Sequence, residues 1–216
     1  VFLAYAEPIW SARGARADAR SMRVTRAELL GHGTNIQLGF SPDSDDGERS
    51  PAGLAHASIA DMQADMEAAK RELQPDYLFV SVHWGDEHQH YPTAAQRAFG
   101  RAAIDAGAAA VLGHHPHVLQ GVEFYNGGFI LYSMGNFVFD MMADTTYRTA
   151  AFHLHLKDGS VDSVVAQPVS IERFAYAPAP ATGSTALSIA RDIQRWSAYL
   201  GTNGTITEAG SVLFSR

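Results

Sequence analysis

The amino-acid sequence predicts an α/β fold in which parallel strands and their covering helices come first and antiparallel strands follow. Two successive helix–strand pairs over residues 58–112 indicate the parallel part, because strands joined through helices pair in parallel. Short apolar strands separated by Gly-containing turns over residues 118–169 indicate the antiparallel part. With 216 residues the chain has the length of one domain, so we expect residues 1–216 to form a single layered unit.

The first expected strand is Val1–Ala6, an apolar run typical of a buried strand. It has no initiator Met and no basic leader, so we expect that natural sequence upstream of residue 1 is missing. Residues 41–57 are rich in Ser, Pro, Asp and Gly, which predicts a flexible surface loop.

Apolar residues at helical spacing predict two helices in the next part of the chain. Ser58–Leu73 begins with a Ser cap and ends just before a proline, and Thr93–Ala106 ends before a glycine. Each helix is followed by an apolar run of strand-forming residues, Tyr77–Val82 after the first and Ala108–Leu112 after the second.

Two strand pairs are expected after these elements. The turn Asn126-Gly127 is a strong hairpin signal, and a second Gly-containing turn follows at residues 157–160. The expected strands are Val118–Tyr125 with Phe129–Ser133, and Ala150–Leu156 with Val161–Val169. Residues 177–216 are expected to hold a Pro- and Ala-rich linker, residues 177–183, and a terminal amphipathic helix, Ala186–Leu200.

Composition excludes several classes of function. The net charge is −7 and no concentrated basic patch is present, which argues against a nucleic-acid partner. No apolar run approaches the roughly 20 residues that cross a bilayer. The absence of cysteine excludes disulfides, thiolate metal sites and cysteine nucleophiles.

Histidines gather where two predicted parallel strands end. Of the 10 histidines in the chain, His83 directly follows one strand, and His114, His115 and His117 follow the next. Ligands of open α/β sheets bind at the carboxyl ends of the strands, so both groups are expected to face one crevice. Proline between His115 and His117 favours extended backbone, which would point both imidazoles the same way.

The residue types at this edge suit a divalent metal. Imidazoles with carboxylates bind Zn, Mn, Fe or Co, and Glu87 and Asp86 supply oxygen ligands or acid–base groups. Asn136, after a later strand, is either polar lining of the crevice or part of a simple turn. Four further histidines are expected to be ordinary polar residues: His88, His90, His153 and His155. No serine-hydrolase elbow and no nucleotide-binding P-loop occurs.

Three segments resemble motifs of the CapA family of capsule (poly-γ-glutamate) synthesis proteins. They occur in the family's order, and the resemblance extends from about residue 1 to about residue 210. The segments are Val80-Ser81-Val82-His83-Trp84-Gly85-Asp86-Glu87, Gly113-His114-His115-Pro116-His117-Val118-Leu119-Gln120 and Tyr132-Ser133-Met134-Gly135-Asn136-Phe137-Val138-Phe139-Asp140. The family resembles the calcineurin-like metallophosphoesterases, which implies a four-layer α/β/β/α sandwich with two divalent ions (Mn, Fe or Zn) at strand ends.

By this resemblance, three histidines are expected metal ligands: His83, His115 and His117. His114 is an alternative to His115, since the extra histidine makes the alignment ambiguous. The expected catalytic residues are His114, Glu87 and Asn136. The family's early Gly-Asp and Asn-Asn-His motifs are absent, so the chain resembles the family's C-terminal half, and two-metal catalysis would be compromised.

Two functions from different classes are therefore expected, and a third interpretation is a metal-free remnant whose histidines are only polar lining of the crevice. The first is a metal-dependent hydrolase, phosphoesterase-like, acting on a phosphoester or amide substrate. The second is a non-catalytic accessory protein that binds or exports an anionic polymer in the same crevice. The resemblance also implies capsule-synthesis membrane partners and a bacterial cell-surface or membrane-associated location. The oligomeric state is left open.

Overall fold

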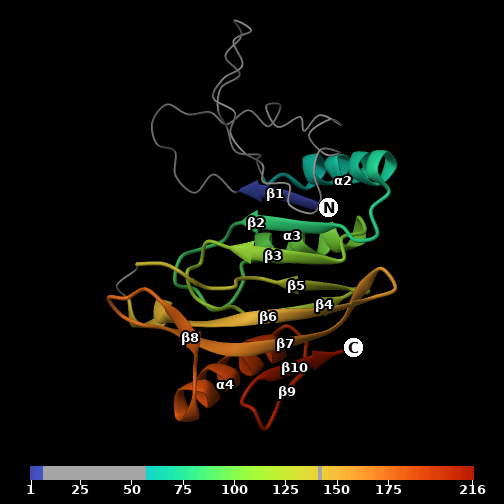
Figure 1. Ribbon diagram of the computed structural model, residues 1–216. Helices are drawn as coiled ribbons and strands as arrows, with labels where there is room; N and C mark the ends of the chain where they lie inside the picture. Colours follow the sequence, from blue (N-terminus) through green and yellow to red (C-terminus); the bar gives the residue numbers. More distant parts are fainter. Residues whose placement is uncertain (7–56, 141–142) are drawn as a thin grey trace, which may run out of the picture.

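The computed structural model describes residues 1–6, 57–140 and 143–216, and it consists of two sheets with helices packed against them (Figure 1). Helices α2 and α3 cover the outer face of a five-stranded sheet, and a second sheet packs on its inner face. Helix α4 packs in the same apolar cluster as the facing sides of the two sheets, next to β4. One mostly parallel and one antiparallel sheet with covering helices confirm the expected α/β fold class, consistent with a metallophosphoesterase-like sandwich. The predicted loop at residues 41–57 lies, except for Ala57, outside the described residues.

The first sheet has the strand order β1-β2-β3-β5-β4. Its strands are β1 (Phe2–Ala6), β2 (Phe79–His83), β3 (Ala110–His114), β5 (Gly128–Leu131) and β4 (Val122–Tyr125). The first four are parallel, and β4 pairs antiparallel with β5. Their hairpin turns at Asn126 and Gly127, with φ of 42° and 88°, as the Asn-Gly signal predicts.

The second sheet has the order β6-β7-β10-β9, with β8 beside β7, and all its pairs are antiparallel. Its strands are β6 (Arg148–Lys157), β7 (Ser160–Ile171), β8 (Pro178–Pro180), β9 (Gly204–Ile206) and β10 (Val212–Ser215). The expectation of only a linker and a helix over residues 177–216 therefore misses three strands. Two of them have three residues each, too short to show an alternating pattern, and β8 contains two prolines.

The helices are α2 (Ile59–Leu73), α3 (Ala94–Asp105) and α4 (Gly183–Tyr199), with a short 3-10 turn, η2 (Asp144–Tyr147), before β6. Ser58 caps α2, and Thr93 caps α3 in a capping box with Gln96. No helix in the described part of the chain is both long and apolar enough to span a bilayer.

Strand alternation decides which side chains reach the space between the sheets. Val80 and Val82 of β2 pack toward α2 and α3, so Phe79, Ser81 and His83 point to the opposite face. The same alternation in β3 places Ala110 and Leu112 in the core between the sheets. His114, two residues after Leu112, continues that face. The parallel strands therefore deliver polar side chains to the inter-sheet face at their carboxyl ends.

Candidate metal site

A cleft of about 760 Å³ lies between the two sheets, and the histidines form one part of its wall. Its polar lining consists of His83, His114, His115, His117 and Asn136. Its other walls are mostly apolar, with aromatic rings from Phe79, Phe137, Phe139 and Phe152. The polar groups and the apolar walls thus share a single concave surface, which is the usual character of a ligand site.

Three of the predicted residues form a compact donor group. One ligand atom from each of Glu87, His115 and His117 lies within 4.8 Å of the other two. The His83 ring is adjacent, with its centroid 4.7 Å from that of His115. Two imidazoles and one carboxylate, with a third imidazole beside them, form a donor set that binds Zn, Mn or Fe. Among the described residues, this group of side chains could hold a divalent ion.

The two histidines converge for a different reason from the one expected. Extended backbone was predicted at His115 and His117, but φ is 98° at His115 and 60° at His117. Positive φ is unfavourable for residues with a Cβ, and such strain concentrates at functional sites. The loop is held partly by the His88 backbone N–H, which donates to the Pro116 carbonyl at 2.9 Å. A tight turn, not an extended strand, brings the imidazoles together.

Asn136 orients one of the ligand candidates. The His117 Nδ1 lies 2.8 Å from the Asn136 Oδ1. A carbonyl oxygen only accepts, so Nδ1 carries the proton and Nε2 keeps its lone pair for a cation. Asn136 is buried, which holds its amide in place. This is the kind of contact that fixes the tautomer of a metal-binding histidine.

His114 has a different environment from its neighbour. Its Nε2 lies 3.2 Å from the Ser81 Oγ, on the adjacent strand, and it is not part of the donor group with Glu87. Burial lowers the pKa of His114 below 6.5, so its ring is kept neutral. Of the two alternatives that the sequence left open, His115 is therefore the one beside the other donors.

The His83 imidazole is also kept neutral. Burial is the main cause that lowers its pKa below 6.5, and the neighbouring His115, His114 and His117 add to the effect. A neutral imidazole is the form that binds a metal ion, so its environment favours ligation at neutral pH.

Several motif residues build the frame of the site. The Trp84 indole is fully buried and donates to the Tyr132 carbonyl at 2.8 Å. At Gly113 an added Cβ would lie 2.0 Å from the Tyr132 carbonyl oxygen, so only glycine allows the two segments to approach. Trp84 and Tyr132 come from different motifs. Part of the resemblance to the family's motifs therefore reflects the packing of these loops.

Buried glutamines, which sequence reasoning missed, connect the two loops that carry the donors. Gln96 of α3 donates to Gln120 at 3.1 Å, and Gln120 donates to the Gln89 carbonyl at 2.8 Å. Both glutamine side chains are fully buried. An isolated Gln on a helix carries no sequence signal for such a role, since most are exposed.

His153 and His155 are exposed on β6, as expected.

A family profile described as "Bacterial capsule synthesis protein PGA_cap" matches residues 5–141, more than half of the chain. The chain belongs to this family. All three motif segments that carry the resemblance lie within the matched range, and the resemblance stated from the sequence is thereby confirmed.

Named relatives of the family agree with the profile. "Capsule biosynthesis protein CapA" of Bacillus anthracis is 39% identical over 109 residues, 50% of this chain and 26% of that protein. "PGA biosynthesis protein CapA" of Bacillus subtilis (strain 168) is 38% identical over 120 residues, 56% of this chain and 32% of that protein. A "Probable polyglutamine synthesis accessory protein" of Mycobacterium tuberculosis is 31% identical over 141 residues, 59% of this chain and 37% of that protein. The matched part of the chain spans about a quarter to a third of the length of these relatives.

Proposed function

We propose that this chain carries a metal-dependent hydrolase site, phosphoesterase-like, that serves the synthesis of an anionic capsule polymer such as poly-γ-glutamate. The observation that carries the proposal is the donor group of Glu87, His115 and His117, whose ligand atoms lie within 4.8 Å of one another. The names of the capsule and polyglutamate synthesis relatives support the biological setting.

The residues present fit a divalent cation. Glu87 brings a negative charge, and His117 presents Nε2 because Asn136 holds its Nδ1 proton. His83 is available as a further ligand from the neighbouring strand. A divalent ion held there would supply Lewis-acid polarisation of a phosphoryl or carbonyl oxygen and charge stabilisation of the transition state. The resemblance implies two ions, and the described residues account for the donors of one.

The other polar residues of the cleft have distinct roles in this proposal. His114 lies outside the donor group and is neutral, with Ser81 at one ring nitrogen, so it suits proton transfer to a leaving group. Asn136 acts through His117 as a positioning residue, since it is the ring nitrogen of His117 that it contacts. The apolar walls exclude water around the reacting bond.

A second candidate, a non-catalytic accessory protein that binds an anionic polymer, is supported by one observation. A relative from Mycobacterium tuberculosis bears the word "accessory" in its name, next to polyglutamine synthesis. In this function the donor group would hold a cation that bridges to carboxylates of the polymer, without turnover. Membrane-associated capsule-synthesis proteins are the proposed partners in both cases.

Turnover distinguishes the two candidates. The metal-loaded chain is incubated with a phosphomonoester, a phosphodiester and a γ-glutamyl amide, and product is measured with Mn²⁺ or Zn²⁺ present. We expect hydrolysis of at least one substrate, lost in His117→Ala and retained in the surface control His153→Ala. Absence of turnover with all three substrates would contradict the hydrolase and favour the accessory function.

A further inference from the structure

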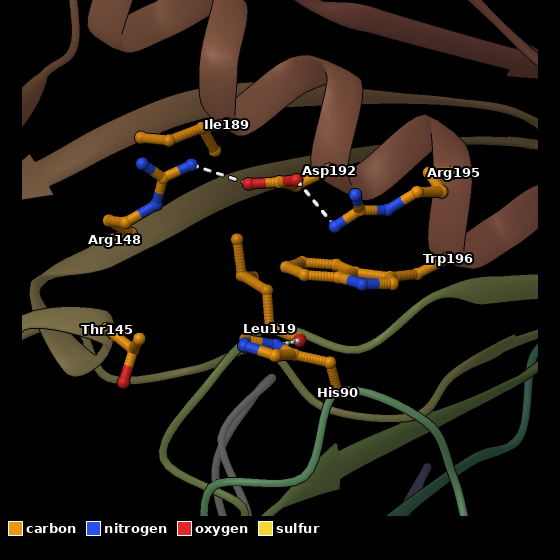
Figure 2. A pocket seen from close by; sticks show the side chains of 8 residues that line it. All are labelled: His90, Leu119, Thr145, Arg148, Ile189, Asp192, Arg195 and Trp196. Carbon is orange, nitrogen blue, oxygen red and sulfur yellow. Dashed lines mark hydrogen bonds and ion pairs between the residues drawn. The ribbon is translucent and has the colours of Figure 1, made fainter.

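A second pocket, of about 230 Å³, lies where α4 meets the loops that follow β2 and β3 (Figure 2). It is lined by His90, Leu119, Thr145, Arg148, Ile189, Asp192, Arg195 and Trp196. None of these residues belongs to the donor group or lines the inter-sheet cleft. In the chain as a whole acidic residues exceed basic ones, so a pocket with two arginines departs from the average surface.

The charges in this pocket do not cancel. Figure 2 shows Asp192 between the two guanidinium groups, with Arg148 at 2.6 Å from Oδ2 and Arg195 at 2.9 Å from Oδ1. Two positive groups share one carboxylate, which leaves a net charge of about +1. Arg148 also donates to Ser188 through the same Nη2 atom. The other N–H groups of its guanidinium have no partner among the described residues.

The remaining walls are suited to an aliphatic chain. The ring of His90 stacks on Trp196, with centroids 4.2 Å apart and an angle of 9° between the planes, as Figure 2 shows. The His90 Nδ1 donates to the Leu119 carbonyl at 2.9 Å, so the ring is fixed. Leu119 and Ile189, both buried, complete the apolar part. The pocket therefore combines a small apolar surface with one uncompensated positive charge.

The pocket and the donor group are built on the same two loops. His90 is three residues after Glu87, and Leu119 is two residues after His117. The loops are tied together by His88 to Pro116, by Gln120 to Gln89 and by the His90–Leu119 bond. The pocket and the donor group are therefore held by one hydrogen-bonded frame.

We infer that this pocket binds a single free carboxylate of an anionic polymer, as a subsite next to the donor group. A net charge of +1 matches one carboxylate better than a phosphate, and the apolar walls match the main-chain methylene groups that adjoin each free α-carboxylate of a γ-linked glutamate polymer. The identification of the polymer rests on the proposed function. The argument from charge does not rest on the proposed function, because it uses only the residues of the pocket.

The test measures binding of a γ-linked glutamate oligomer by titration calorimetry at low salt. EDTA is present, so failure of the metal site cannot affect the result. We expect Arg148→Gln to weaken binding about tenfold or more, since a charge-assisted hydrogen bond is lost. Asp192→Asn removes the competing carboxylate and is expected to strengthen binding by a similar factor. Arg71→Gln, at an exposed arginine on α2, is the matched control and should change nothing.

Opposite effects of the two variants separate ligand binding from a structural role, because a purely structural ion pair would make both variants less stable without raising affinity. Thermal unfolding of each variant is measured alongside. Inorganic phosphate binding as tightly as the oligomer, an unchanged affinity in folded Arg148→Gln, or no binding to the wild-type chain would each overturn the carboxylate subsite.

Discussion

At the scale of single residues, the site depends on how each imidazole is held. His117 has its Nδ1 at 2.8 Å from Asn136, His114 contacts Ser81, and His83 lies against His115. The sequence alone indicated which residues would meet, because the carboxyl ends of parallel strands share an edge. It did not indicate the positive φ values at His115 and His117, since nothing in the residue types distinguishes a tight turn from extended backbone around Pro116.

Removing the oxygen of Asn136 is expected to weaken metal binding without removing a ligand. Asn136→Leu loses the acceptor that fixes the His117 tautomer, and such losses typically lower metal affinity by about 10- to 100-fold. Asn136→Asp retains an acceptor and should restore most of the affinity. Calorimetric titration with Zn²⁺ measures both variants. Equal affinity in wild type and Asn136→Leu would show that this contact does not orient the ligand.

The titration of His83 in the metal-free chain is expected below its ordinary midpoint of 6.5, because burial and the neighbouring histidines disfavour the protonated ring and lower its pKa. Just below pH 6.5 the folded state then binds fewer protons than the unfolded state, so the free energy of unfolding decreases as the pH falls. Proton NMR of the His83 ring in EDTA-treated protein gives the midpoint. A midpoint at or above 6.5 would contradict the described environment.

At the scale of elements, β3 closely approaches the end of β5. The resemblance of the sequence to the family's motifs does not by itself indicate this contact. Gly113 lies in β3, and its missing side chain makes room for the Tyr132 carbonyl, which also accepts from Trp84. The helices α2 and α3 were predicted nearly to their ends, because capping residues and apolar periodicity mark them. The strands of the first sheet were predicted to within about two residues, except that β4 begins at Val122 and not at Val118. The strands β8 and β9 were not predicted, since segments of three residues depend on pairing partners far along the chain.

Gly113→Ala is expected to destabilise the fold strongly. Its Cβ would lie 2.0 Å from a backbone oxygen, which cannot move as a flexible side chain can. We expect a loss of about 2–4 kcal/mol in the free energy of unfolding, measured by urea denaturation. Gly159→Ala is the control, since φ is 77° there and no atom lies within 4 Å of the added Cβ. The Gly159→Ala control should lower the free energy of unfolding by only about 1 kcal/mol, because of backbone strain. Equal effects of the two substitutions would contradict the close approach.

At the scale of the whole molecule, the two sheets and two apolar cores place every predicted site residue at one edge of the first sheet. The core under α2 and α3 is one cluster, and the core shared by the two sheets and α4 is a second, separate cluster. The inter-sheet cleft is lined by residues of β2, β3 and β5 on one side and of β6 on the other. The order of helices and strands along the sequence, together with the family resemblance, predicted the parallel and antiparallel parts of the fold. They did not predict the arginine pocket, because Arg148 and Arg195 lie 47 residues apart and meet only through α4 and β6.

The central claim is that Glu87, His115 and His117 bind a divalent ion, and metal content tests it most directly. The purified chain is loaded with Mn²⁺ or Zn²⁺, passed through a desalting column and analysed for elements, beside a His115→Ala/His117→Ala variant and a His153→Ala/His155→Ala control. The structure predicts about one retained ion per chain in the wild type and the control, and none in the site variant. Two ions would indicate that donors outside the described residues contribute. No retained ion in the folded wild type, or equal content in the site variant, would contradict the metal site.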